Sequence, residues 1–248
     1  MTLPAIARFL KSYCWFIALG IFLIPLAAQP QERAVTMKVV EVKQGAENVS
    51  DAANVVVWLN PLDGSKQGAA SEAANRESPQ LVQRNKRFEP HILVVRVGTV
   101  VQFPNRDPFF HNIFSLYDGK RFDLGLYEAG TTRSVRFDRP GVSFLFCNIH
   151  AEMSAAVVAV DSPYFAISDN QGRVKIASVP DGRYELHVWS ERGTLENVKN
   201  LTHVVEISES SRALPPLRVI DNPDFTLAHK NKYGQDYVPP PNPGYVQP

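Results

Sequence analysis

The stretch that decides the fold reads GVSFLFCNIHAEM and spans residues 141–153. Apolar side chains alternate through its first half, and this period of two predicts a β-strand with two different faces. One face carries Val142, Phe144 and Phe146. The strand ends near Cys147, and His150 and Met153 follow at intervals of three residues before the next apolar run begins. One short loop between two strands is therefore expected to present a thiolate, an imidazole and a thioether together.

An earlier histidine offers a further strong ligand. The segment FPNRDPFFH, residues 103–111, contains the turn-forming pairs Pro-Asn and Asp-Pro and places His111 where the next strand is expected to start. Two imidazoles and a thiolate with a weak axial thioether hold blue copper in proteins, whereas zinc is more often held by four strong ligands. These residue types therefore predict one copper ion, provided that the strand at His111 packs beside the loop. Its ligands would be His111, Cys147, His150 and Met153.

The first 28 residues have the pattern of an export signal. Two basic residues precede an apolar run at about residues 13–26, and two alanines follow it as the expected cleavage site. The run is shorter than the ~20 residues that a spanning helix usually needs, so the protein is expected in the periplasm, with an uncut membrane anchor as the alternative. Cleavage would remove Cys14 and leave Cys147 as the single cysteine. A lone thiol in an oxidising compartment is explained by metal ligation, inert burial, an intermolecular disulfide or chance.

The rest of the chain predicts an all-β protein. Its formal net charge is +1, from 26 basic and 25 acidic residues without a charged run, so nothing favours a nucleic-acid partner. Short β-branched and aromatic runs recur between turn-forming residues, and no long segment after the signal has a helical period. Strands are expected near Val35–Val42, Ala53–Leu59, Leu81–Phe88, Ile92–Val97, Thr99–Phe103, Asn112–Ser115, Thr132–Phe137, Gly141–Phe146, Ala155–Asp161, Tyr164–Ser168, Val174–Ser178, Arg183–Ser190 and Leu201–Ile207.

The stretch at about residues 81–161 resembles the cupredoxin family of plastocyanin and amicyanin. The resemblance rests on FEPHILVVRVGTVVQFPN at residues 88–105, on the pair His111-Asn112 and on the ligand spacing C-x-x-H-x-x-M. The whole exported chain is similar to bacterial methylamine-utilisation or plastocyanin-like proteins, which share CNIH and a later YFA segment. Those relatives often carry Asp-Trp between the His and Met, where this chain has Ala151-Glu152. The resemblance implies a cupredoxin Greek-key β-barrel or sandwich with one type 1 copper site.

A second resemblance concerns the segment YFAISDNQGRVKIASVPDGRYELHVW, residues 164–189. It resembles the carboxypeptidase-regulatory or transthyretin-like β-sandwich, whose early strands the segment GAENVSDAANVVVWL at residues 45–59 also matches. We therefore expect the copper domain to be inserted into a smaller sandwich, and a tandem order is the alternative.

The expected division is a signal peptide at 1–28, the first sandwich strands at 34–62, a flexible loop at 63–79, the cupredoxin domain at 80–161, the remainder of the sandwich at 162–220 and a Pro-rich tail at 221–248, which is expected to be extended or disordered.

The cupredoxin resemblance also implies roles for residues around the metal. Asn112 is expected to brace the His111 loop against the Cys147 loop through side-chain hydrogen bonds. Asn148 and Phe146 are expected beside the ligands, and neighbouring phenylalanines are expected to shield the site from water. Outer partners of this kind orient ligands and tune the metal.

The ligand set predicts an electron carrier. Four ligands fixed between strands leave copper little room to rearrange between oxidation states and no open position for a substrate, so an enzyme is not expected. By family analogy, the ring of His150 would pass electrons to a redox protein such as a c-type cytochrome or a periplasmic oxidoreductase. The alternative is a periplasmic or cell-surface binding module with a copper-holding or vestigial site. An enzyme subunit would need a second cluster, and the remaining histidines, His91, His187, His203 and His229, show no tight ligand spacing.

Overall fold

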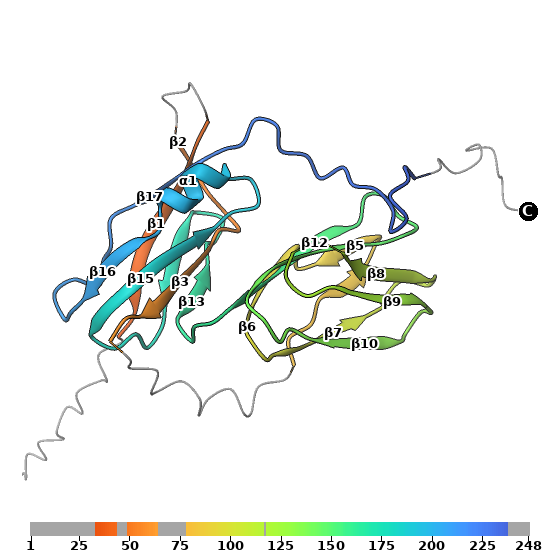
Figure 1. Cartoon of the computed structure of the whole chain (residues 1–248), viewed down its shortest axis with the longest axis horizontal. Coiled ribbons are helices and arrows are strands. Elements are labelled where there is room, and N and C mark those ends of the chain that lie inside the picture. Colours follow the sequence, from red (N-terminus) through yellow and green to blue (C-terminus); the bar gives the residue numbers. More distant parts are fainter. Residues whose placement is uncertain (1–32, 44–48, 64–77, 117, 238–248) are drawn as a thin grey trace, which may run out of the picture. The chain divides into compact units, whose positions relative to one another are not determined.

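The computed structural model describes residues 33–43, 49–63, 78–116 and 118–237 (Figure 1). The predicted signal peptide at 1–28 lies outside the described residues, as does most of the loop expected at 63–79. The described chain is nearly all β, as the sequence predicts, and its one helix is the short α1 (Leu195–Asn200). Within these ranges no helix is both long and apolar enough to cross a membrane.

One group of strands, which we call the sandwich, forms two sheets around an apolar cluster. The first sheet has the order β14-β1-β17, with β2 paired to β1, and the second has the order β13-β3-β15-β16. The strands are β1 (Val35–Val42), β2 (Val49–Asp51), β3 (Val56–Pro61), β13 (Phe165–Ile167), β14 (Arg173–Ile176), β15 (Gly182–Trp189), β16 (His203–Ile207) and β17 (Leu217–Ile220). Alternation in β1 buries Val35, Met37 and Val39, so this strand gives one face to the cluster.

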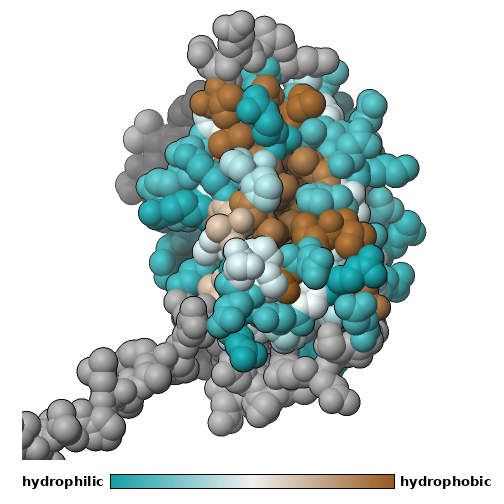
Figure 2. Space-filling model, turned by 90° about the vertical axis from the view of Figure 1, so that its left-hand side faces the viewer, coloured by the Kyte–Doolittle hydropathy of each residue, from teal (hydrophilic) through white to brown (hydrophobic). Residues whose placement is uncertain are grey.

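The edge strand β16 brings the apolar cluster of the sandwich close to the surface. Val205 and Ile207 belong to the cluster, whereas the neighbouring Val204 is exposed. Leu201 and Leu214 pack against the cluster and stay partly exposed. Figure 2 looks onto the side of the sandwich that carries β16 in Figure 1 and shows hydrophobic residues gathered in a band between hydrophilic ones.

The second group of strands, which we call the metal-bearing group, consists of β4 to β12. It contains a five-stranded sheet of order β6-β12-β11-β8-β9 and the pairs β10-β7 and β4-β5, and these described strands form open sheets rather than a closed barrel. The strands are β4 (Val82–Arg84), β5 (Arg87–Glu89), β6 (Ile92–Arg96), β7 (Val100–Pro104), β8 (His111–Ser115), β9 (Phe122–Tyr127), β10 (Thr132–Arg136), β11 (Gly141–Phe146) and β12 (Ser154–Val160). The apolar cluster of this group includes Cys147 and Met153.

An early strand of the described chain pairs with two late strands. β3 pairs antiparallel with β13 and β15, although the whole metal-bearing group lies between β3 and β13 in sequence. A third apolar cluster contains residues of both groups, among them Val56 of β3 and Val158 of β12. The early strands thus belong with the late ones, while the boundaries of the predicted domains stay a prediction.

The structure differs from the predicted strands at Leu81–Phe88. This segment forms the hairpin of β4 and β5, whose turn residues Asn85 and Lys86 have φ values of 53° and 54°. Two successive residues with positive φ make a tight hairpin turn, which simple alternation does not reveal. The strands predicted from the sequence also do not include β2, β9 or β17, and α1 was not predicted.

Candidate metal centre

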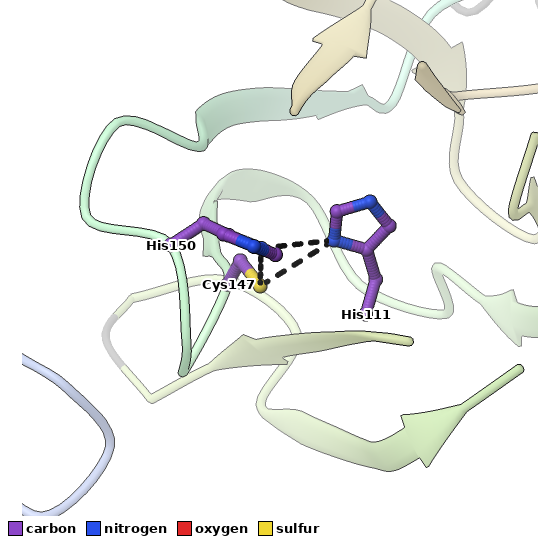
Figure 3. A group of neighbouring side chains, drawn as sticks. All are labelled: His111, Cys147 and His150. Atoms are coloured by element: carbon purple, nitrogen blue, oxygen red, sulfur yellow. Dashed lines mark hydrogen bonds between the residues drawn. The ribbon is translucent and has the colours of Figure 1, made fainter. Parts of the chain in front are cut away.

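Three of the predicted ligands lie together. His111 is the first residue of β8, Cys147 directly follows β11, and His150 lies in the loop between β11 and β12. The sulfur of Cys147 lies 3.9 Å from Nδ1 of His111 and 3.6 Å from Nδ1 of His150 (Figure 3). The two nitrogens are 3.2 Å apart, and all three donor atoms lie within 4.8 Å of one another.

These separations fit ligands that share one ion. Protein nitrogens lie about 2.0 Å and sulfurs about 2.3 Å from a transition metal such as zinc, so a trigonal set would be spaced at roughly 3.5–3.7 Å. Strand pairing explains the convergence, because β8 and β11 are antiparallel neighbours with Phe146 opposite Phe114. The end of one strand is thereby brought to the start of the other, and the residues present can hold a metal.

A buried carboxylate orients the ring of His111. Oδ2 of Asp107 lies 2.7 Å from Nε2 of His111, so Nδ1 is left to face Cys147. The backbone N–H groups of Asn85 and Lys86, in the β4–β5 turn, donate to the same carboxylate at 2.6 and 2.9 Å. Burial opposes ionisation of Asp107, but the hydrogen bonds from Lys86 and His111 outweigh it and hold its pKa below the ordinary value.

The thiol of Cys147 is fully buried and is not part of a disulfide. Burial raises its pKa, and hydrogen bonds from the backbone amides of Asn112, Ile149 and His150 partly oppose this effect. The same amides would stabilise a thiolate, the form of cysteine that binds metals. A metal bound here would therefore release the thiol proton and leave a thiolate that accepts hydrogen bonds from these backbone amides.

The ring of His150 is only partly buried, unlike that of His111. Burial, and then the neighbouring His111, lower the pKa of His150. The neutral ring keeps a lone pair for a metal at neutral pH. Phe109 covers both rings, with its centroid 5.2 Å from that of His111 and 5.7 Å from that of His150. The pair therefore has one sheltered and one more accessible imidazole.

Met153 closes the loop that carries Cys147 and His150. Its backbone N–H donates to the carbonyl of His150, and its carbonyl accepts from the N–H of Cys147, both at 3.2 Å. Its side chain is fully buried in the apolar cluster that contains Cys147. The predicted role of Met153 as the axial ligand stays a prediction.

The predicted neighbours of the ligands make contacts of their own. The side chain of Asn112 donates to Oδ1 of Asp123 on β9 at 2.8 Å, so the bridge expected from this side chain to the Cys147 loop is made instead by its backbone amide. Oδ1 of Asn148 accepts from the backbone N–H of Lys232 at 3.0 Å. Phe146 packs between two rings, those of Phe114 and His229.

Sequence reasoning missed two sets of residues at the centre. Asp107 lies four residues before His111, and a carboxylate at that spacing in a turn was a signal that could have been used. The segment from Phe225 to Tyr237 was expected to be extended or disordered, yet it contacts the Cys147 loop. No periodicity in that segment predicts these contacts.

His91 is not among the three residues whose donor atoms converge in the described part of the chain. One of its ring nitrogens lies 3.1 Å from the carbonyl oxygen of Ser154, and the other lies 2.7 Å from Oε2 of Glu191. Both nitrogens are thus occupied, which leaves no free lone pair for a metal.

Comparison with known proteins gives only distant and partial matches, all of them among solved structures. No protein-family model and no curated protein matches the chain. A copper-containing nitrite reductase from Thermus scotoductus SA-01 is 21% identical, with a TM-score of 0.33, over 38% of this chain and 24% of that chain. A purple cupredoxin from Nitrosopumilus maritimus is 24% identical, with a TM-score of 0.31, over 33% of this chain and 99% of that chain. A Cu(I) amicyanin mutant is 20% identical, with a TM-score of 0.33, over 42% of this chain and 98% of that chain.

Proposed function

We propose that the chain is an exported type 1 copper protein that carries single electrons between redox partners. The observation that carries the proposal is the convergence of the donor atoms of His111, Cys147 and His150 within 4.8 Å. Imidazole and thiolate donors suit copper, whereas magnesium and calcium prefer oxygen ligands. Copper held by such a set supplies one-electron oxidation and reduction.

Met153 completes the proposed ligand set as a weak axial thioether. A buried thioether three residues after His150 suits copper, because a thioether is a poor ligand for zinc. Asp107 fixes the orientation of the His111 ring from outside the ligand set. The chain's own residues thus supply three strong donors, one weak donor and an orienting carboxylate.

The rigidity of these positions favours a carrier over an enzyme. His111 and Cys147 stand at the ends of paired strands, and two backbone hydrogen bonds close the loop from Cys147 to Met153. Ligands held in this way rearrange little between oxidation states, which lowers the barrier to electron transfer. With four protein ligands there is no open position for a substrate.

The proposed route for electrons leaves through His150. Phe109, which is 37% exposed, packs against this partly exposed ring, and the preceding residue, Ile149, is 46% exposed. A weakly apolar surface of this kind suits brief docking to a redox protein such as a c-type cytochrome or a periplasmic oxidoreductase. The predicted signal peptide places the exchange in the periplasm.

Spectroscopy of the copper-loaded chain tests the proposal. Copper(II) is added to the metal-free protein, and we expect an intense visible absorption band from thiolate-to-copper charge transfer. Cys147→Ser should abolish the band, and His111→Ala should abolish or strongly shift it. The matched control is His187→Ala, because His187 stacks on Trp58 in the sandwich. A colourless copper complex would favour the alternative of a copper-holding module, and a copper affinity unchanged in Cys147→Ser would overturn the assignment.

A further inference from the structure

The chain after β17 runs from the sandwich to the candidate metal centre. We call residues 222–237 the C-terminal strap, which Figure 1 shows in blue from β17 to the neighbourhood of β8. Its first part is fixed to the sandwich, because the backbone N–H of Asn222 donates to the carbonyl of Arg192 at 2.7 Å. The guanidinium of Arg192 also lies 5.3 Å from the ring centre of Phe225. The strap therefore starts from an anchored position.

The other end of the strap binds the ligand loop directly. The hydroxyl of Tyr237 donates to the carbonyl oxygen of Cys147 at 2.5 Å. The backbone N–H of Lys232 donates to the side-chain oxygen of the next residue, Asn148, at 3.0 Å. Two successive residues of the loop, one of them the thiolate ligand, are thus tied to residues about 90 positions away in the chain.

Ring packing adds a third contact, to the residue before Cys147. The ring of His229 stacks on Phe146 with centroids 4.2 Å apart and an interplanar angle of 26°. Tyr237 meets the same imidazole edge-on at 5.3 Å. Nδ1 of His229 lies 3.1 Å from the carbonyl of Leu227, while its buried Nε2 has no hydrogen-bond partner among the described residues. The ring is thus held mainly by packing between aromatic neighbours.

The strap reaches the segment of the other histidine as well. The ammonium of Lys232 pairs with Oδ2 of Asp123 at 2.7 Å. Oδ1 of the same carboxylate accepts from the side chain of Asn112, which directly follows His111. One lysine therefore connects, through its backbone and its side chain, to both segments that carry strong ligands.

A local turn gives the strap the shape that these contacts require. The side-chain oxygen of Asn231 accepts from the backbone N–H groups of Tyr233 and Gln235 at 2.9 and 3.0 Å. Side-chain bonds of this kind stabilise turns without a regular strand or helix. The turn spans Asn231 to Gln235 and contains Lys232, and Tyr237 follows it by two residues, so both residues can reach the loop.

We propose that the C-terminal strap positions the metal ligands, with Tyr237 and Lys232 as its positioning residues. A hydrogen bond to the carbonyl of Cys147 restrains the peptide from which the sulfur projects. Losing that restraint lets the loop open more often and lets the sulfur move relative to the two histidines. Only the copper part of this proposal rests on the proposed function, because the restraint on the thiol exists without a metal.

The metal-free protein provides the first test, through the rate at which a thiol reagent modifies buried Cys147. Tyr237→Phe should raise this rate about fivefold, the factor for one hydrogen bond of about 1 kcal/mol. Tyr184→Phe is the matched control, because the hydroxyl of Tyr184 also donates to a backbone carbonyl, that of Pro180 at 3.0 Å, but lies in the sandwich. Equal rates in the two variants would overturn the proposal. Lys232→Met, compared with Lys230→Met, repeats the test on the ion pair and should give about a twofold increase.

The copper-loaded protein provides the second test. Tyr237→Phe should shift the charge-transfer bands and the reduction potential, while Tyr184→Phe leaves both unchanged. A purely structural role would instead lower the thermal unfolding temperature and leave the spectrum and the potential unchanged, which would contradict positioning. If the wild-type chain gives no such band with copper, the proposed function fails, while the rate of thiol modification still decides whether the strap restrains Cys147.

Discussion

The sandwich and the metal-bearing group bury polar side chains in different ways. Among the described residues of the sandwich and the turn that leads into it, the buried polar ones are Ser162 and Ser168. Each hydroxyl donates to a backbone carbonyl, Ser162 to that of Leu59 at 2.6 Å and Ser168 to that of Ala52 at 2.7 Å. The metal-bearing group buries Gln83, Asn105, Asp107, His111, Asn112, Ser115 and Ser143.

This difference indicates that the buried polar side chains have different roles in the two groups. The two serines satisfy backbone groups inside an otherwise apolar core, which is how a fold is stabilised at little cost. The metal-bearing group instead buries an ionisable pair, Asp107 and His111. Apolar residues would often make such a core more stable. The buried carboxylate of Asp107 is therefore best explained by its contact with the His111 ring at the candidate metal centre.

Removing the charge of Asp107 should have the largest effect. Asp107→Asn leaves Nε2 of His111 without its carboxylate partner and turns an amide group toward backbone N–H groups that need an acceptor. We expect the free energy of unfolding to fall by about 3 kcal/mol and copper affinity to fall about 10- to 100-fold. Denaturant unfolding and copper titration measure the two effects. The exposed Asp118→Asn serves as control, and equal behaviour of the two variants would contradict the role of Asp107.

Copper binding should stabilise the metal-bearing group more than the sandwich. At a free concentration 100 times the dissociation constant, a bound metal stabilises the folded state by about 2.7 kcal/mol. Amide hydrogen exchange should therefore slow in β8 and β11 more than in β14 and β15. Magnesium should leave both groups unchanged, and a chelator should reverse the effect of copper. Uniform protection of all strands would show that the two groups unfold as one unit.

A change in the sandwich should act on stability alone. Ser168→Ala removes a hydroxyl that donates to Ala52 and accepts from the backbone N–H of Val55. We expect a loss of about 1–2 kcal/mol in the free energy of unfolding and no change in copper affinity. In a double variant with Asp107→Asn, the two losses should add to within about 0.5 kcal/mol. Strong non-additivity would mean that the groups are energetically coupled.

The smallest effect is expected from the His91–Glu191 pair, which links the two groups. A hydrogen bond from His91 to Glu191 raises the pKa of His91 above 6.5, although burial acts in the opposite direction. The pair's contribution is therefore full below about pH 6.5 and is lost as the pH rises through the higher folded pKa. Because the side chain of His91 is 34% exposed, we expect less than about 1 kcal/mol.

The pH profile of the unfolding free energy measures this contribution. His91→Gln should remove the decline that accompanies rising pH in this range. His203→Gln, at an exposed position on β16, should keep it. An unchanged profile in His91→Gln would show that the pair does not contribute to stability.

The sequence could predict the parts of the molecule that local patterns encode. Alternation from Val142 to Phe146 predicts β11, and the spacing of Cys147, His150 and Met153 predicts a loop with three donors. Both patterns depend only on the period of a strand and on the few residues that follow it. The hairpin at Asn85 was not predicted, because its turn depends on backbone angles, which the alternation of apolar and polar residues does not reveal.

Local sequence patterns alone predict an all-β chain, a loop rich in donor atoms and a set of residue types that bind metals. The remaining features depend on the path of the folded chain. The tertiary structure placed the nitrogen of His111 3.9 Å from the sulfur of Cys147, bound Asp107 to the far side of that ring and brought Tyr237 to the carbonyl of Cys147. Each of these is a contact between single atoms, and most of them join residues far apart in the chain. Such contacts leave no repeating pattern in the sequence, because they depend on the path of the folded backbone and not on the local preferences of any one segment.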